Sequence, residues 1–102
     1  MAFRPVGKLA DFPEGKGVEV VVGSRRIAVY RVRGELFALK NICPHQGDSL
    51  HRLPPEAGAA VCIGHGWRFD LRTGRCIRGE PAARVAVYPV KVENDTVLID
   101  VD

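Results

Sequence analysis

The sequence predicts an all-β fold, an antiparallel sandwich or barrel that carries one small insert. Short apolar and β-branched runs recur near both ends of the chain, separated by glycine-containing breaks, as is typical of antiparallel sandwiches and barrels. No stretch shows the sustained apolar period of a long helix. Residues 42–80 differ from both ends, because they lack the regular spacing and contain all three cysteines and all three histidines.

The N-terminal third is predicted to be mostly strand. Residues 3–9 form a short extended start, and residues 11–15 have the composition of a turn. Gly23-Ser24 suits a two-residue hairpin turn, and Gly34 suits a second turn. The strands expected around these two turns are residues 18–22, 27–32 and 36–39.

The middle of the chain is predicted to be a connection with short strands. Residues 48–60 contain Pro54-Pro55 and no long periodicity, so we expect at most one short helical turn there. Residues 67–70 and 75–77 are expected to form strands around a turn at 72–74.

The C-terminal third returns to strand. Residues 85–92 are expected to form one extended run, in which Pro89 suits an edge or a bulge. A turn at 94–95 precedes a closing strand at 96–101. We therefore expect residues 1–102 to form a single domain. Its parts are a β base from residues 1–41 and 81–102 and an insert from residues 42–80.

Composition restricts the class of protein. A chain of 102 residues with 46% apolar and 26% charged residues suits one ordinary globular domain. It has no apolar run of the roughly 20 residues that cross a membrane, and residues 1–5 do not resemble a signal peptide. We therefore expect a cytoplasmic protein with no membrane partner. A formal net charge of +3 is too weak to predict binding to nucleic acid.

Two short segments each offer one thiol and one imidazole. Cys43 and His45 are spaced C-x-H, and Cys62 and His65 are spaced C-x-x-H. Structural zinc accepts two cysteines and two histidines, but it usually keeps like ligands together. Mixed pairs suit a centre with two unlike irons, as in a Rieske [2Fe-2S] cluster, where two histidines replace two cysteines on one iron. A zinc-stabilised interaction module stays open as an alternative.

The two motifs resemble a known family. C-P-H-Q-G-D-S-L followed by C-x-x-H-G-W-R-F-D-L-R-T-G is similar to Rieske-type [2Fe-2S] ferredoxins of dioxygenases and to nitrite reductase small subunits. The resemblance covers essentially the whole chain and implies a Rieske-like β base with a cluster-binding insert. It also implies one [2Fe-2S] cluster per chain, with Cys43 and Cys62 on one iron and His45 and His65 on the other.

Departures from the respiratory branch of the family bear on the reduction potential. Those members carry two further cysteines, joined as a disulfide, where this chain has Asp48 and Gly64. They also carry a serine and a tyrosine whose hydroxyls donate hydrogen bonds to sulfur, where this chain has Trp67 and Phe69. Hydrogen bonds to sulfur stabilise the reduced cluster, so we expect a potential in the lower part of the Rieske range.

The resemblance implies a one-electron carrier, a component of a multi-component system and not an enzyme. It would take electrons from a flavin-containing reductase and pass them to an oxygenase or a similar reductase. A fixed electron-transfer subunit of a nitrite reductase-type complex is the alternative. Five arginines near the motifs suit either an acidic docking partner or a plain solvated surface: Arg52, Arg68, Arg72, Arg75 and Arg78.

Two residues fall outside the motifs. His51 is expected to be a surface residue, with a supporting or docking role as the alternative. Cys76 is expected to be a plain strand residue, with a reactive thiol as the alternative.

Overall fold

A four-stranded antiparallel sheet is the centre of the structure, a computed structural model that describes residues 2–45 and 47–101. The sheet has the order β2-β3-β4-β8. Its strands are β2 (Gly17–Val22), β3 (Arg25–Val32), β4 (Glu35–Lys40) and β8 (Val87–Tyr88). Tight turns join β2 to β3 and β3 to β4, with Val22 opposite Arg25 and Val32 opposite Glu35.

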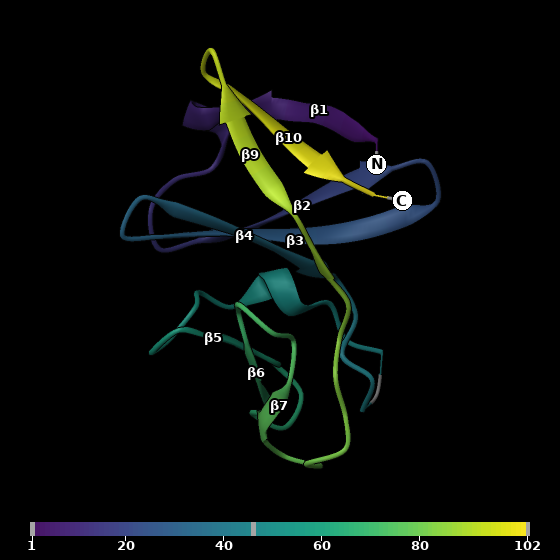
Figure 1. Ribbon diagram of the computed structural model, residues 1–102. Coiled ribbons are helices and arrows are strands. Elements are labelled where there is room, and N and C mark those ends of the chain that lie inside the picture. Colours follow the sequence, from purple (N-terminus) through teal and green to yellow (C-terminus); the bar gives the residue numbers. More distant parts are fainter. Residues whose placement is uncertain (1, 46, 102) are drawn as a thin grey trace.

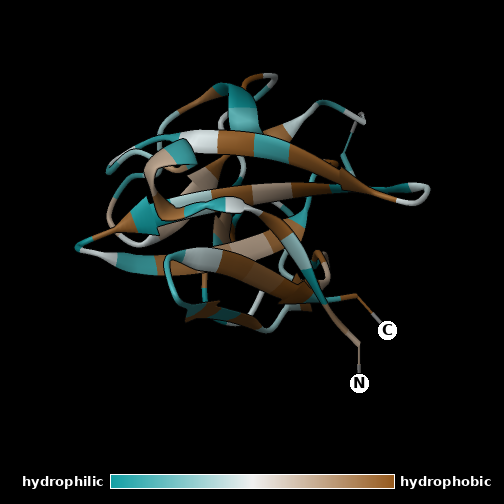
Figure 2. Cartoon of the chain, turned by 90° about the horizontal axis from the view of Figure 1, so that it is seen from above, coloured by the Kyte–Doolittle hydropathy of each residue, from teal (hydrophilic) through white to brown (hydrophobic). Residues whose placement is uncertain are grey.

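A three-stranded antiparallel sheet packs on this central sheet. Its order is β1-β10-β9, formed by β1 (Phe3–Lys8), β10 (Thr96–Asp100) and β9 (Val90–Glu93). The turn between β9 and β10 places Asn94 and Asp95 at positive φ, 49° and 69°, which Asn and Asp tolerate better than most residues. Figure 2 shows hydrophobic stretches along the strands, while several turns between them are hydrophilic.

Strand β3 is buried on both of its faces. Ile27, Ala28, Val29 and Tyr30 are all fully buried. Because successive side chains of a strand point to opposite faces, Ile27 and Val29 join a core with Val97 and Ile99 of β10. Ala28 and Tyr30 join a second core, which contains both Cys43 and Cys62. Strand β3 is therefore shared between the two cores.

The second core is covered by a small third sheet. It has the order β5-β6-β7, formed by β5 (Ala59–Val61), β6 (Arg68–Asp70) and β7 (Cys76–Arg78). Figure 1 shows this sheet stacked against the central one, with the N- and C-termini close together in the opposite part of the molecule. No helix within the described residues is long and apolar enough to span a bilayer.

In the part of the chain that the structure describes, helical structure is limited to single turns. The 3-10 helices are η1 (Leu9–Asp11) and η2 (Leu50–Arg52). The all-β prediction is confirmed, and η2 is the short helical turn expected between residues 48 and 60.

The expected single strand over residues 85–92 is wrong in one respect. The run divides at Pro89, with β8 paired to β4 of the central sheet and β9 paired to β10 of the other sheet. Proline has no N–H to donate to a ladder, so it suits the point at which the chain leaves one sheet and enters the next.

Candidate functional site

The loop at residues 43–48 begins directly after the central sheet. Beyond the end of β4, Cys43 is fully buried. Its backbone N–H donates to the carbonyl of Asp48 at 2.7 Å, and its own carbonyl accepts from the N–H of Gly47 at 2.8 Å. Gly47 has a φ of 78°, a left-handed conformation that glycine adopts without a steric penalty.

The loop at residues 62–67 is closed in the same way. The N–H of Cys62 donates to the carbonyl of Trp67 at 2.8 Å, and its carbonyl accepts from the N–H of Gly66 at 3.1 Å. Gly66 has a φ of 71°. Each loop therefore starts at a buried cysteine, turns at a left-handed glycine, and is closed by the residue after that glycine.

The two loops bring the predicted histidines into contact. The ring centroids of His45 and His65 lie 4.6 Å apart, with an interplanar angle of 82°. His65 is exposed and His45 is half-buried. The Nδ1 atom of His45 is buried and has no hydrogen-bond partner among the described residues. An unsatisfied buried nitrogen is costly, so this atom suits a bond to a group not made of protein.

The predicted cysteines lie on the interior side of the same region. Cys43 and Cys62 belong to one core cluster with Tyr30, Leu50 and Phe69. Burial, and next the charge of the Cys62 thiolate, raise the pKa of Tyr30 above its ordinary value. Both cysteines therefore pack with the apolar core, while His65 of the histidine pair is exposed to solvent.

Trp67 packs against the ring of His45. The indole and imidazole rings are stacked, with centroids 4.4 Å apart and an interplanar angle of 22°. The space behind the indole depends on Gly79, because a Cβ added there would lie 2.5 Å from Cδ2 of Trp67. Gly79 also has a φ of 130°. The segment after β7 therefore packs against Trp67, and Trp67 in turn contacts His45.

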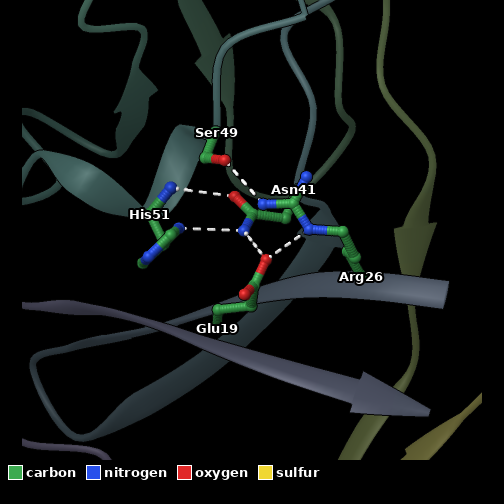
Figure 3. Close-up of polar contacts among 5 residues, drawn as sticks. All are labelled: Glu19, Arg26, Asn41, Ser49 and His51. Atoms are coloured by element: carbon green, nitrogen blue, oxygen red, sulfur yellow. Dashed lines mark hydrogen bonds and ion pairs between the residues drawn. The ribbon is translucent and has the colours of Figure 1, made fainter.

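A polar network lies where the base of the first loop meets the central sheet (Figure 3). Asn41, which is fully buried, accepts from the backbone N–H of His51 at 2.9 Å and donates to Oε2 of Glu19 at 2.8 Å. Its amide nitrogen also lies 2.9 Å from Nδ1 of His51. Arg26 joins the network through Glu19 at 2.6 Å and Ser49 at 2.6 Å.

The network corrects one prediction and shifts one pKa. His51 is half-buried and hydrogen-bonded, so the expectation of a plain surface histidine is wrong. The hydrogen bond from Asn41, and next that from Arg26, lower the pKa of Glu19. The sequence carried a weak signal of this network, since Asn41 is a polar residue between an apolar strand and a predicted ligand.

The remaining candidate residues lie around the third sheet. Cys76 is half-buried at the start of β7, as expected for a strand residue, and its thiol lies 3.2 Å from the carbonyl of Arg78. Two of the five arginines are paired with glutamates, Arg68 with Glu56 at 2.6 Å and Arg72 with Glu35 at 2.8 Å. These pairs reduce the basic character of the region.

The donor set of the site consists of two pairs. The cysteines share one buried cluster and the histidines share one ring contact. Among residues 2–45 and 47–101, no three His, Cys, Asp or Glu side chains are grouped as the ligands of one metal ion would be. A pair of buried cysteines and a pair of histidines in contact fit a binuclear group in which one iron binds the two sulfurs and the other iron binds the two nitrogens.

Comparisons of the sequence and of the structure with known proteins both find Rieske-type proteins. Residues 2–89 match the Rieske [2Fe-2S] domain family. The ferredoxin component of the naphthalene 1,2-dioxygenase system from Pseudomonas aeruginosa is 35% identical over 92 residues, covering 90% of this chain and 88% of that protein.

Solved structures share the fold over nearly the whole chain. The ferredoxin of Sphingomonas yanoikuyae B1 matches with a TM-score of 0.90 and 28% identity, covering 99% of this chain and 100% of that one. A chain from the complex of reduced oxygenase and oxidized ferredoxin in carbazole 1,9a-dioxygenase matches with a TM-score of 0.86 and 26% identity, covering 95% of this chain and 91% of that one. The chain therefore belongs to the Rieske [2Fe-2S] domain family.

Proposed function

We propose that this protein is a one-electron carrier that passes electrons from a flavin-containing reductase to a terminal oxygenase. The observation that carries the proposal is the pair of matching loops, which place two buried cysteines in one core cluster and two imidazoles in ring contact, with the ring of His65 exposed. Membership of the Rieske family and the likeness to dioxygenase ferredoxins support the same role.

The proposed ligands are Cys43 and Cys62 for one iron and His45 and His65 for the other. When bound, a [2Fe-2S] cluster supplies an exchangeable electron. The protein holds the sulfur side among apolar residues and leaves the ring of His65 exposed. An exposed imidazole edge would give a docked partner a short path for the electron, and Trp67 would hold the other imidazole in place.

The proposed partners follow from the relatives. A relative is the ferredoxin component of a dioxygenase system, and a structural match comes from a complex of an oxygenase with a ferredoxin. We infer that an oxygenase is the acceptor and that a reductase is the donor. On this account the chain carries electrons between enzymes and transforms no substrate itself. A reducing cytoplasmic compartment suits three cysteines of which two bind iron.

We also propose that the chain divides into a base, residues 1–41 and 81–102, and an insert, residues 42–80. The third sheet and both loops come from the insert. The polar network of Asn41, His51 and Glu19 would then be a joint between the two parts.

Electron paramagnetic resonance of the dithionite-reduced protein tests the ligand assignment. We expect a signal typical of a cluster with two nitrogen ligands, lost in His45→Ala and in His65→Ala. His51→Ala is the matched control and should keep the signal, because it removes an imidazole from outside the two loops. Retention of the signal in both ligand variants would refute the assignment.

The alternative is a fixed subunit of a nitrite reductase-type complex. Size-exclusion chromatography of native extract separates the two roles, because a free carrier elutes as a small protein and a fixed subunit elutes with its large partner. Reduced protein should also be oxidised when it is mixed, without oxygen, with the oxygenase component of an aromatic dioxygenase. No oxidation by the oxygenase, together with co-elution with a large partner, would favour the alternative.

A further inference from the structure

The residue that closes each loop reaches across to the other loop. Trp67 closes the loop at 62–67 and stacks on His45 of the first loop. Asp48 closes the loop at 43–48 and lies against Gly64 of the second loop. The two loops therefore have the same backbone hydrogen bonds but different contacts with each other. The second loop contributes an aromatic ring to the first, and the first contributes a carboxylate to the second.

The carboxylate of Asp48 fills the space that a side chain at position 64 would take. A Cβ added to Gly64 would lie 2.5 Å from Oδ2 of Asp48 and 3.8 Å from Sγ of Cys62. Together these distances place the carboxylate oxygen no more than about 6 Å from the sulfur, a range at which unit charges interact appreciably near a protein surface. Asp48 is half-buried, so solvent and salt screen this charge less than a fully exposed one.

We propose that the carboxylate of Asp48 lowers the reduction potential of the cluster, an inference that rests on the proposed function. With two ferric ions, two sulfides and two thiolates, the oxidised cluster and its ligands carry no net charge, and one added electron makes them negative. A fixed negative charge close to Cys62 raises the free energy of the reduced form more than that of the oxidised form. Asp48 thus acts as a positioning residue whose charge affects the cluster through space.

The approach of the Asp48 carboxylate to Cys62 also depends on Gly64. Its φ is not in the left-handed region, so the local backbone does not require glycine. The absence of a Cβ is instead what lets the carboxylate approach Cys62. Gly64→Ala should therefore displace the end of the Asp48 side chain while keeping its charge in the molecule.

Potentiometric titration of the holoprotein tests the proposal. Asp48→Asn should raise the midpoint, with about a tenfold gain in the equilibrium constant for reduction, which is about 59 mV for one electron. The matched control is Asp95→Asn, which removes the same charge in the β9–β10 turn, where Asn is equally suited to the positive φ. The control should move the midpoint by less than a third as much.

A double-mutant cycle of Asp48→Asn with Gly64→Ala separates the effect of the Asp48 charge near Cys62 from other effects of Asp48→Asn. Gly64→Ala alone should raise the midpoint in the same direction, and Asp48→Asn should have a smaller effect in that background than in the wild type. If Asp48→Asn does not retain its cluster, Gly64→Ala decides, because a raised midpoint supports the proposal and an unchanged one overturns it.

Iron content, sulfide content and the paramagnetic resonance signal of each variant distinguish a failure of the Asp48 proposal from a failure of the proposed function. Loaded protein with a normal signal, but equal midpoints for Asp48→Asn and Asp95→Asn, would overturn the role of Asp48 alone. Wild-type protein without iron and sulfide would instead mean that the proposed function has failed.

Discussion

At the scale of single residues, the predicted cysteine and histidine ligands lie in different environments. Cys43 and Cys62 are almost fully buried, whereas His65 is exposed. Apolar surroundings favour a thiolate only when its charge is compensated, and iron on the sulfur side would provide this compensation. On the nitrogen side, Nδ1 of His45 is buried without a hydrogen-bond partner in residues 2–45 and 47–101, and a bond to the second iron would satisfy it.

The reduction potential follows from what surrounds the sulfurs. Trp67 and Phe69 have no hydroxyl to donate, and Phe69 is fully buried in the core below the loops. We expect a midpoint in the lower part of the Rieske range of about −150 to +300 mV. Potentiometric titration checks this, and a midpoint above about +100 mV on the same scale would show that hydrogen bonding to sulfur has been underestimated.

Gly79→Ala should disturb the stack of Trp67 on His45. The added Cβ would clash with the indole ring, so we expect a loss of about 1–3 kcal/mol in the free energy of unfolding and a changed fluorescence of this only tryptophan. Gly34→Ala is the matched control, since Gly34 also has a positive φ, 78°, but has open space around it.

The control should cost only about 1 kcal/mol for the left-handed conformation and leave the fluorescence unchanged. Equal losses in denaturant unfolding and equal spectra for the two variants would mean that the segment at Gly79 does not support Trp67.

Sequence reasoning at this scale found the ligand pairs but not their neighbours. The spacing of Cys43, His45, Cys62 and His65 is visible in one dimension. The contact of Asp48 with Gly64 and that of Trp67 with His45 depend on how the two loops meet. Asp48 and Gly64 are nevertheless the two positions at which respiratory members of the family place bonded cysteines, which agrees with their closeness here.

At the scale of elements, β3 and η2 hold the loops in place. β3 supplies Ala28 and Tyr30 to the core below both cysteines. Asn41, just beyond β4, clamps η2 through the backbone and ring of His51. The base of the first loop is therefore fixed by a buried amide whose partners come from β2 and η2.

Asn41→Ala should destabilise the protein by about 2 kcal/mol, because it leaves the backbone N–H of His51 without its partner and removes one of the two hydrogen bonds to Oε2 of Glu19. Denaturant unfolding measures the loss. Glu35→Gln, at the exposed pair with Arg72, is the control and should cost less than about 1 kcal/mol. A loss for Asn41→Ala no greater than the control would show that the clamp is weak.

Glu19 should make stability depend on pH in the acid range. Its pKa is lowered from the ordinary 4.5 by the hydrogen bond from Asn41 and next by that from Arg26. Its contribution to stability is therefore complete above pH 4.5 and is lost as the pH falls below this value through the folded-state pKa. Unfolding of Glu19→Gln and wild type across this range should show a difference at neutral pH that shrinks in acid. A constant difference would contradict the assignment.

The elements themselves were largely predictable. Short apolar runs separated by glycine turns indicated β2, β3 and β4, and the middle of β3 and the end of β4 are indeed buried. The division at Pro89 was not predicted, since a change of partner from β4 to β10 is a tertiary event. The role of His51 was missed for a similar reason, as its hydrogen-bond partner Asn41 lies ten residues away in the chain.

At the scale of the whole molecule, the site lies away from the chain ends. The termini lie beside the sheet of β1, β10 and β9, and the sheet of β5, β6 and β7 lies in the opposite part (Figure 1). The principal extents are 38 × 26 × 18 Å, so the loops occupy one part of an elongated molecule. Because His65 is exposed, a docked partner can reach its ring.

The measurement that tests the central claim most directly is the iron and acid-labile sulfide content of the purified protein. The account predicts two irons and two sulfides per chain, as a [2Fe-2S] cluster requires, and a loss of both in a Cys43→Ser, Cys62→Ser double variant. Zinc in place of iron, or a wild-type protein with neither iron nor sulfide, would contradict it.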